Sequence, residues 1–248
     1  HRPSEKLVEL LTSSKKDGLE QITVSLIHEL SKASGVKIED FGVTGSILTS
    51  IHRPEFSDID LVVYGYETAK HVKDTMLTSL SNQVSPIQPL KGQRLRRSLR
   101  HWTERYHLSK PEAEWFSGRK WNYGIFEQHL FSIHPVKPPR EVQGKYGDRT
   151  YQPQGIVEGA AKIVNITESF FLPCEYRIKN VQPTSSLEKV ESLVSYNGFF
   201  SGIFQVDDVV KFRGKLEAVC SKSGESSCRV LIGSPEARGF DYIKPSLS

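Results

Sequence analysis

The sequence predicts an α+β protein, with an N-terminal α/β domain whose mixed sheet is flanked by helices and a small β-barrel-like domain after it. Up to residue 80, amphipathic stretches with helical spacing alternate with short apolar runs. From residue 154 onward, short β-branched runs are separated by Gly, Pro, Asn and Ser. Between the two parts, Pro138-Pro139 followed by Gly144 and Gly147 indicates a linker. We therefore expect domains at 1–140 and 141–248.

Length, charge and cysteine usage narrow the class of protein. A chain of 248 residues suits two domains, and its net charge of +4 permits nucleic-acid or nucleotide binding without requiring it. No apolar run approaches the ~20 residues that span a bilayer, so we expect no membrane partner. The three cysteines form no C-x-x-C pair, which argues against a disulfide framework or a structural zinc site. The first residues contain neither Met nor an apolar signal core, so we expect a trimmed or disordered terminal boundary and a cytoplasmic protein.

The N-terminal part reads as alternating helices and strands. A helix opens at Pro3 and is broken at Asp17-Gly18, and a second helix carries apolar residues from Ile22 to Leu30. A strand follows at Phe41–Val43, and a second strand runs through Ile59–Val63. Gly65 then turns the chain into another amphipathic helix between residues 69 and 80, which completes an α/β unit.

The candidate functional residues lie at the ends of the two expected strands. Gly45-Ser46 follows the first strand at a tight turn, where a glycine lets backbone approach an anion and the serine hydroxyl can hold phosphate oxygens. Asp58 and Asp60 alternate with apolar residues, so strand geometry places them on one face about 7 Å apart. Two carboxylates this close favour a hard divalent cation, and Mg²⁺ (or Mn²⁺) bound with a triphosphate fits them.

Gly45-Ser46, eleven residues, and then Asp58-Ile59-Asp60-Leu61 resembles the signature of the DNA polymerase β-type nucleotidyltransferase superfamily. The resemblance covers about 20 residues. It implies a nucleotidyltransferase-like first domain, with Gly45, Ser46 and Ser57 binding the nucleotide. It also implies that Asp58 and Asp60 are catalytic and hold the metal. A surface hairpin whose aspartates cap a turn is the plain structural alternative.

The superfamily places a third catalytic carboxylate on a later strand, within an apolar-acid-apolar triplet. The expected strand His129–Val136 offers Ser132 and His134 where that acid would stand. Glu127 is the nearest acid, so Glu127 and His134 are the two possible third ligands. Without a third carboxylate, metal and nucleotide binding by Asp58 and Asp60 remains expected, but the chemistry becomes an open question.

A basic stretch runs from Lys91 to Arg105 with no acid before Glu104. If it is helical, Arg96, Arg97 and Arg100 share one face, and with Arg94 they are possible nucleic-acid contacts. A solvated helix face is the equally weighted alternative. The aromatic residues that follow are expected mainly in the core, with a base-stacking platform as the second interpretation; they are Trp115, Phe116, Trp121 and Tyr123.

The C-terminal part predicts short strands at 154–164, 174–181, 208–219 and 228–232, with a short helix at Leu187–Leu193. Glycines within or beside these strands indicate sharp bends, as in a small barrel. Basic residues that alternate on the strands indicate either a basic face or protected edges. The segments 198–202 and 232–240 look similar to uncharacterised archaeal predicted nucleotidyltransferases, a resemblance that names no reaction.

The leading prediction is a metal-dependent nucleotidyltransferase that transfers a nucleoside monophosphate from a nucleoside triphosphate to an unknown hydroxyl acceptor, with RNA as one acceptor considered. The alternative is a non-catalytic nucleotide- or RNA-binding protein that has lost the third carboxylate. A toxin–antitoxin style modifier of protein hydroxyls is the third interpretation, because the signature is shared.

Overall fold

The computed structural model describes residues 2–142, 144–145, 147–183, 189–222, 224 and 226–247. The chain has an α+β fold that divides into two compact units. The first unit comprises His1–Gly92 and Lys120–Val142, and the second comprises Gln93–Arg119 and Gln143–Ser248. In this grouping the segment 93–119 joins the second unit, whereas the division into domains 1–140 and 141–248 remains a prediction.

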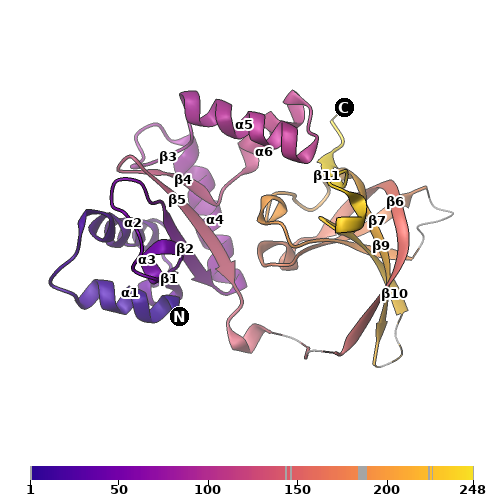
Figure 1. Cartoon of the computed structure of the whole chain (residues 1–248), viewed down its shortest axis with the longest axis horizontal. Coiled ribbons are helices and arrows are strands. Elements are labelled where there is room, and N and C mark those ends of the chain that lie inside the picture. The colour runs from indigo at the N-terminus through magenta and orange to yellow at the C-terminus, as the bar shows by residue number, and fades with distance from the viewer. Residues whose placement is uncertain are drawn as a thin grey trace. The chain divides into compact units, whose positions relative to one another are not determined.

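A mixed sheet of five strands is the centre of the first unit (Figure 1). Its strand order is β1-β2-β5-β4-β3, and β2 and β5 are parallel while the other neighbours are antiparallel. The strands are β1 (Phe41–Val43), β2 (Ile59–Tyr64), β3 (Ile87–Gln88), β4 (Tyr123–Phe126) and β5 (His129–Val136). In β2, the aliphatic side chains of Ile59, Leu61, Val62 and Val63 are buried, as expected for a strand in the interior of the sheet.

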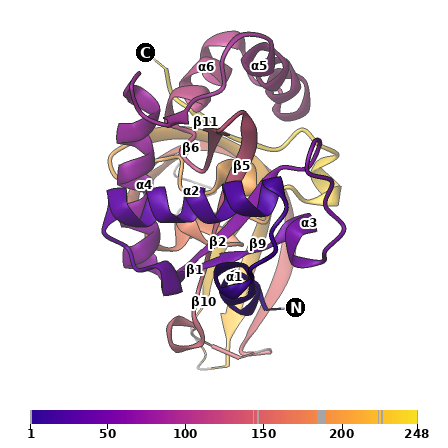
Figure 2. The ribbon, with the colours of Figure 1, turned by 90° about the vertical axis from the view of Figure 1, so that its left-hand side faces the viewer.

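The helices of the first unit bury their apolar stripes against this sheet and against one another. They are α1 (Pro3–Thr12), α2 (Gly18–Ser34), the short α3 (Gly45–Leu48) and α4 (Tyr66–Ser81), and Figure 2 shows α1 and α2 in front of β1 and β2. Leu26, Ile27 and Leu30 of α2 are fully buried, as the helical spacing predicts. Gly42 lets α1 approach β1 closely, because a Cβ there would lie 2.8 Å from Cβ of Pro3.

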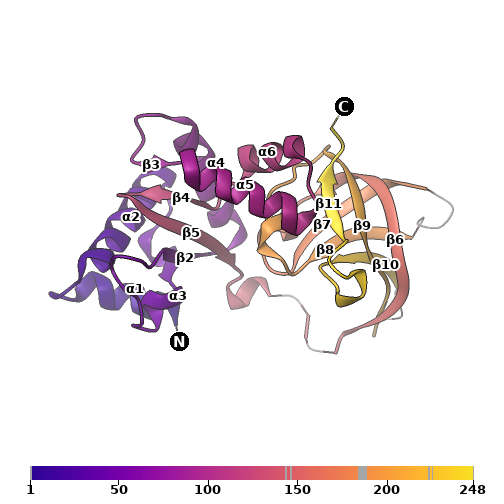
Figure 3. The same cartoon turned by 45° about the horizontal axis from the view of Figure 1, so that its top comes forward.

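A second mixed sheet forms the core of the second unit, with the strand order β10-β8-β7-β6-β9-β11 and an additional pairing of β10 with β9. The strands are β6 (Arg149–Asn165), β7 (Cys174–Gln182), β8 (Val190–Ser195), β9 (Val209–Ser221), β10 (Ser226–Ile232) and β11 (Tyr242–Pro245). The long strands β6 and β9 run antiparallel side by side, as Figure 3 shows. Three-residue to four-residue 3₁₀ turns lie at Ile38–Asp40, Pro139–Glu141, Thr167–Phe170, Gly198–Phe200 and Pro235–Ala237.

Two helices, α5 (Gly92–Tyr106) and α6 (Lys110–Arg119), pack on the second unit through aromatic rings. The Tyr106 ring stacks on Phe199 with centroids 3.9 Å apart, and Phe116 lies 4.8 Å from the same ring. Arg119 forms an ion pair with Asp208, which fixes the end of α6 to the loop before β9. This aromatic cluster, with Trp102, Phe200 and Phe204, is therefore the core between the helix pair and the sheet of the second unit.

The structure bears out most expected elements and corrects one. The helices from Pro3, through 22–30 and through 69–80, and the strands at 41–43, 59–63 and 129–136 are confirmed. The short helix expected at Leu187–Leu193 is wrong from Val190 onward, where β8 pairs with β7 and β10, and residues 187 and 188 lie outside the described part. Sheet pairing on both sides overrides the helical spacing of those few apolar residues.

The four aromatic residues that follow the basic stretch belong to different units. Trp115 and Phe116 pack in the aromatic cluster of the second unit, whereas Trp121 and Tyr123 belong to the first. Phe116 and Trp121 are fully buried, so the expectation of core packing is confirmed for both. The three cysteines are free thiols, and among the described residues no helix is both long and apolar enough to cross a membrane.

Tyr176 provides a test of the core of the second unit. Its buried hydroxyl donates to the carbonyl of Phe200 and accepts the amide of Ile203 at 3.0 Å, and burial raises its pKa far above the usual value. Tyr176→Phe leaves both backbone groups without a partner, so we expect the free energy of unfolding to fall by about 1–3 kcal/mol.

Denaturant unfolding measures this loss, and Tyr151→Phe is the matched control because Tyr151 lies in the same sheet with an exposed ring. The control is expected to change stability by less than about 0.5 kcal/mol. Equal stability of Tyr176→Phe and the wild-type protein would contradict the assigned hydrogen bonds.

Candidate functional site

The Gly-Ser segment and the Asp-Ile-Asp segment meet at one edge of the first sheet. Asp60 is the second residue of β2, and its backbone carbonyl accepts the amide of Thr44 at 2.9 Å. Asp58 stands just before the strand and is exposed, whereas the side chain of Asp60 is 24% exposed. The antiparallel pairing of β1 with β2 therefore brings residues 44–46 next to Asp60, as the sequence pattern requires for a shared site.

Gly45 is required by the space that Asp60 occupies. Its φ is +62°, and a Cβ at this position would lie 2.2 Å from Oδ2 of Asp60. A side chain at residue 45 would therefore displace the carboxylate as well as strain the backbone. Ser46 follows in α3 and is half-buried, and its hydroxyl has no hydrogen-bond partner among the described residues.

Ser57 closes the loop that leads into β2. Its Oγ accepts the amide of Arg53 at 2.9 Å, and its own amide donates to the carbonyl of Arg53 at 2.9 Å. The hydroxyl oxygen of Ser57 thus holds the loop that precedes Asp58. Its proton remains able to donate to a ligand, so its predicted nucleotide contact remains a prediction.

Ser132 stands beside Asp60 on the neighbouring strand. The parallel pairing of β2 with β5 places Asp60 opposite Ser132 and Val62 opposite His134. Oγ of Ser132 donates to Oδ1 of Asp60 at 2.6 Å, and Nε2 of His134 lies 2.7 Å from the same Oγ. Because the serine proton is given to Asp60, Nε2 of His134 must carry the proton that it shares with Oγ.

The two contacts that link His134 to Ser132 and Ser132 to Asp60, here called the Asp60 relay, determine the electrostatics of Asp60. The neighbouring imidazole of His134 lowers the pKa of Asp60 below its usual value, and the hydrogen bond from Ser132 adds to the effect while burial opposes it. The imidazole Nε2 is 3.7 Å from Oδ1 of Asp60, and the His134 side chain is 49% exposed. The carboxylate is thus held in its charged form by neighbouring donors, and Oδ2 lies on the side of Gly45.

The two possible third ligands lie in different surroundings. Glu127 is exposed in the turn between β4 and β5, with a φ of +42°, and its carbonyl oxygen is 2.9 Å from Nδ1 of His129. His134, in contrast, is brought to Asp60 by the strand register. Of the two, His134 is the one that contacts the Asp60 relay.

A different group in the described residues has the donor set of a metal site, namely Asp17, Glu20 and His52. Asp17 and Glu20 form a capping box at the start of α2, in which Oδ1 of Asp17 accepts the Glu20 amide at 2.9 Å. Nε2 of His52 is 2.7 Å from Oδ2 of Asp17 and ties the loop after α3 to this cap. Hydrogen bonds within the first unit therefore account for this cluster, which the sequence analysis does not single out.

The basic stretch forms the helix α5, so the condition under which Arg96, Arg97 and Arg100 were expected to share one face is met. Arg94, Arg96, Arg97 and Arg100 are exposed, while Leu95 and Leu99 are half-buried and Trp102 is buried. The arginines therefore lie on the solvent side of an amphipathic helix. This placement is compatible with both nucleic-acid contact and a solvated face, so the contact remains a prediction.

Comparison with known proteins finds an archaeal relative. The chain is 28% identical over 211 residues to an uncharacterized protein, MJ1086, of the archaeon Methanocaldococcus jannaschii. The match covers 85% of this chain and 60% of that protein, so the chain spans well under the full length of the relative. No family model matches the chain, and no solved structure matches it.

The contact between Gly45 and Asp60 can be tested by comparing two glycines. Gly45→Ala and Gly35→Ala both strain a left-handed residue, but a Cβ at Gly35 meets nothing within 4 Å. We expect Gly35→Ala to cost about 1 kcal/mol of unfolding free energy, and Gly45→Ala to cost at least about 1 kcal/mol more because of the carboxylate.

Denaturant unfolding of both variants measures the difference. Equal costs would mean that Asp60 moves away freely, and would remove the steric reason for a glycine at residue 45.

Proposed function

We propose that this chain is a metal-dependent nucleotidyltransferase that transfers a nucleoside monophosphate from a nucleoside triphosphate to a hydroxyl acceptor. The observation that carries the proposal is the meeting of Gly45-Ser46 with Asp60 at the start of β2, with Asp58 directly before the strand. Phosphate-binding and metal-binding residue types thereby share one edge of the sheet.

The donor set fits a magnesium ion that takes most of its ligands from phosphate and water. Asp58 and Asp60 offer hard oxygen ligands, and Oδ2 of Asp60 has no hydrogen-bond partner among the described residues. A bound Mg²⁺ (or Mn²⁺) would neutralise the charge that develops as pyrophosphate leaves. Gly45 leaves room for the Asp60 carboxylate itself, and the Ser46 hydroxyl can donate to a phosphate oxygen.

The order of elements within the first unit supports the resemblance on which the sequence prediction rests. In the first unit, a strand-turn-helix that carries Gly-Ser precedes the strand that carries the aspartates, and a parallel strand follows later in the chain. We propose a nucleotidyltransferase-like arrangement for this unit. We also propose that the second sheet is a small barrel, since β10 pairs with both β8 and β9. The free thiols support a cytoplasmic location.

The second candidate function is nucleotide or RNA binding without catalysis, and one observation favours it. Ser132, not an acid, pairs in register with Asp60 and donates to it. In the transferase reading, a third ligand must come from His134 or from Glu127. The acceptor is the same open question in both readings, with RNA and protein hydroxyls as the classes to test.

Metal and triphosphate binding is expected to depend on Asp60. Titration calorimetry with Mg²⁺ or Mn²⁺ and each triphosphate should show binding that Asp60→Asn weakens at least tenfold, about 1.4 kcal/mol. Asp74→Asn, on the exposed side of α4, is the control and should bind like the wild-type protein. Unchanged affinity in Asp60→Asn would rule out the metal assignment.

Transfer of label from each triphosphate to pools of RNA and protein separates the two candidate functions. Transfer should disappear in Asp58→Ala and fall strongly in either His134→Ala or Glu127→Ala, which names the third ligand. If the triphosphate binds and nothing is transferred, the binding-protein reading holds. Ser132→Asp then places an acid in register with Asp60, and gain of transfer in that variant would show that this position is what the chemistry lacks.

RNA binding, if RNA is the acceptor, is expected to involve the exposed arginines of α5. Replacing Arg96 and Arg97 by Ala should flatten the slope of log affinity against log salt by about one to two units. The reason is that binding releases fewer counterions from the RNA when fewer phosphates are contacted. Lys37→Ala with Lys70→Ala removes the same charge from the first unit and should leave the slope unchanged. A salt-independent affinity would return the arginines to the solvated-face reading.

A further inference from the structure

The second unit contains a pocket of about 650 Å³ whose residues play no part in the site at Asp60. It is built from the end of α5, the Tyr196–Phe200 segment and the loop from Ile232 to Asp241. These last two segments are the ones that the sequence analysis singles out at 198–202 and 232–240. A volume of this size suits a single nucleotide or a molecule of similar size.

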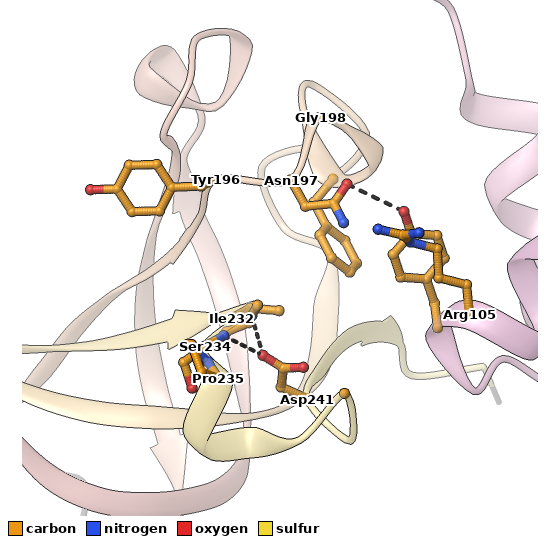
Figure 4. Close-up of a pocket in the computed structure, with 12 residues that line it drawn as sticks. Arg105, Tyr196, Asn197, Gly198, Ile232, Ser234, Pro235 and Asp241 are labelled. Atoms are coloured by element: carbon orange, nitrogen blue, oxygen red, sulfur yellow. Dashed lines mark hydrogen bonds between the residues drawn. The ribbon is translucent and has the colours of Figure 1, made fainter.

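Asp241 places a hydrogen-bond acceptor in this pocket. Its side chain is 8% exposed, and its Oδ2 accepts the amides of Gly233 and of Ser234, the latter at 3.0 Å. Figure 4 shows both of these bonds reaching one carboxylate oxygen. The other oxygen, Oδ1, has no partner among the described residues, although Asp241 is more than nine-tenths buried. A carboxylate oxygen at the wall of a pocket is a strong hydrogen-bond acceptor, so the pocket is suited to a ligand that presents N–H or O–H groups.

Asn197 places a donor in the same pocket, and its orientation is fixed. Its Oδ1 accepts the amide of Phe199 at 2.9 Å and lies 3.3 Å from the hydroxyl of Tyr106. A backbone amide can only donate, so this atom is the oxygen and Nδ2 carries the two protons. Nδ2 makes no hydrogen bond to a described residue. The pocket thus presents one acceptor and one donor group, both held by backbone contacts.

Arg105 adds a positive charge to this lining. It is exposed, and its nearest interaction with a described residue is with the ring of Tyr106, 5.8 Å from the centroid. It forms no ion pair with a described residue, so the guanidinium is available for an anion. Figure 4 shows Arg105 and Asn197 facing one another from α5 and the Tyr196–Phe200 segment.

We propose that this pocket binds a nucleoside monophosphate, with Asp241 and Asn197 reading the base and Arg105 contacting the phosphate. The edge of a nucleobase presents N–H donors beside a carbonyl or ring-nitrogen acceptor, which matches an Asp acceptor beside an Asn donor. Guanine matches best, because N1–H and the N2 amino group both reach a carboxylate oxygen while O6 accepts from an amide. A sugar phosphate lacks this edge and satisfies Arg105 alone.

The nucleotide has two sources, a free molecule or an unpaired nucleotide of an RNA strand. Tyr196 also lines the pocket, and 64% of its surface is exposed. An exposed aromatic face of this kind can stack on a neighbouring base of a strand, which a free nucleotide does not have. The site shares no residue with Gly45, Asp58 or Asp60, so it does not depend on the proposed transferase activity.

Titration calorimetry of the whole chain, without added metal or triphosphate, tests the proposal. The probes are the four nucleoside monophosphates, guanosine, ribose 5-phosphate and a short single-stranded RNA that contains one guanosine. GMP is expected to bind at least tenfold more tightly than ribose 5-phosphate and more tightly than AMP. Tighter binding of the RNA, lost in Tyr196→Ala while GMP binding is kept, identifies the strand as the source; equal binding of GMP and RNA identifies the free nucleotide.

Two variants that preserve the fold examine the base contacts. Asp241→Asn keeps a carbonyl oxygen for the amides of Gly233 and Ser234 but turns an amide donor toward the pocket, and it should weaken GMP at least tenfold. Asn197→Asp keeps the acceptor for the Phe199 amide and removes the donor, with the same expected loss. Thermal unfolding should show both variants folded.

Arg105→Ala examines the phosphate contact, and it should lower the affinity for GMP to that for guanosine while leaving guanosine unchanged. Lys70→Ala, which removes an exposed positive charge from α4, is the control and should bind GMP like the wild-type protein. No binding of any probe, equal binding of GMP and ribose 5-phosphate, or GMP binding that is lost in Lys70→Ala and kept in Asp241→Asn would overturn the proposal.

Discussion

The parallel pairing of β2 with β5 decides what the carboxylate of Asp60 can touch. Because the strands are in register at Asp60 and Ser132, the side chains of these two residues meet across the sheet. On the other side, the antiparallel pairing with β1 ends at Val43, so the chain turns at Gly45 directly against the same carboxylate. A shift of either pairing by one residue would move Asp60 to the opposite face, and no carboxylate would then exclude a side chain at residue 45.

The second unit depends on a different interaction, the packing of α5 and α6 on Phe199, Phe200 and Phe204. Tyr106 stacks on Phe199, and its hydroxyl lies near Asn197, so one side chain both anchors α5 and helps to orient the pocket. Trp102 and Phe116 bury the rest of this contact. The arginines of α5 lie on the opposite face of the helix from this apolar stripe, so burial of the stripe leaves them exposed to solvent.

Local patterns in the sequence predict the elements that local forces determine. The helices α1, α2 and α4 follow from apolar spacing, and Asp17 and Gly35 mark the start and end of α2 through a capping box and a left-handed residue. The strands β1, β2 and β5 follow from apolar runs. Gly45 is predicted from its motif, but its contact with Asp60 requires the pairing of two strands that are remote in the chain.

The features that sequence reasoning misses depend on partners far away in the chain. β8 is too short for its spacing to exclude a helix, and its identity comes from pairing with β7 and β10. The two-residue strand β3 pairs with only two residues of β4, so no local pattern indicates it. The pocket at Asp241 joins segments that are more than 30 residues apart, and the amides of Gly233 and Ser234 that hold its carboxylate follow from the folded loop and not from a local pattern. The resemblance that the sequence analysis notes for 198–202 and 232–240 is the signal that points to these segments.

The hydrogen bond from Ser132 determines which oxygen of Asp60 remains for a cation at the proposed metal site. A third carboxylate in place of Ser132 would repel Asp60, and only a cation could hold the two acids together. Instead, the hydrogen bond from Ser132 and the neighbouring imidazole of His134 stabilise the charge on Asp60. Oδ1 of Asp60 accepts the hydrogen bond from Ser132, so a cation at the proposed metal site would bind through Oδ2, the oxygen that lies against Gly45. In the metal site that we propose, Asp58, exposed at the start of the strand, would be the second protein ligand, and phosphate oxygens and water would complete the shell of the ion.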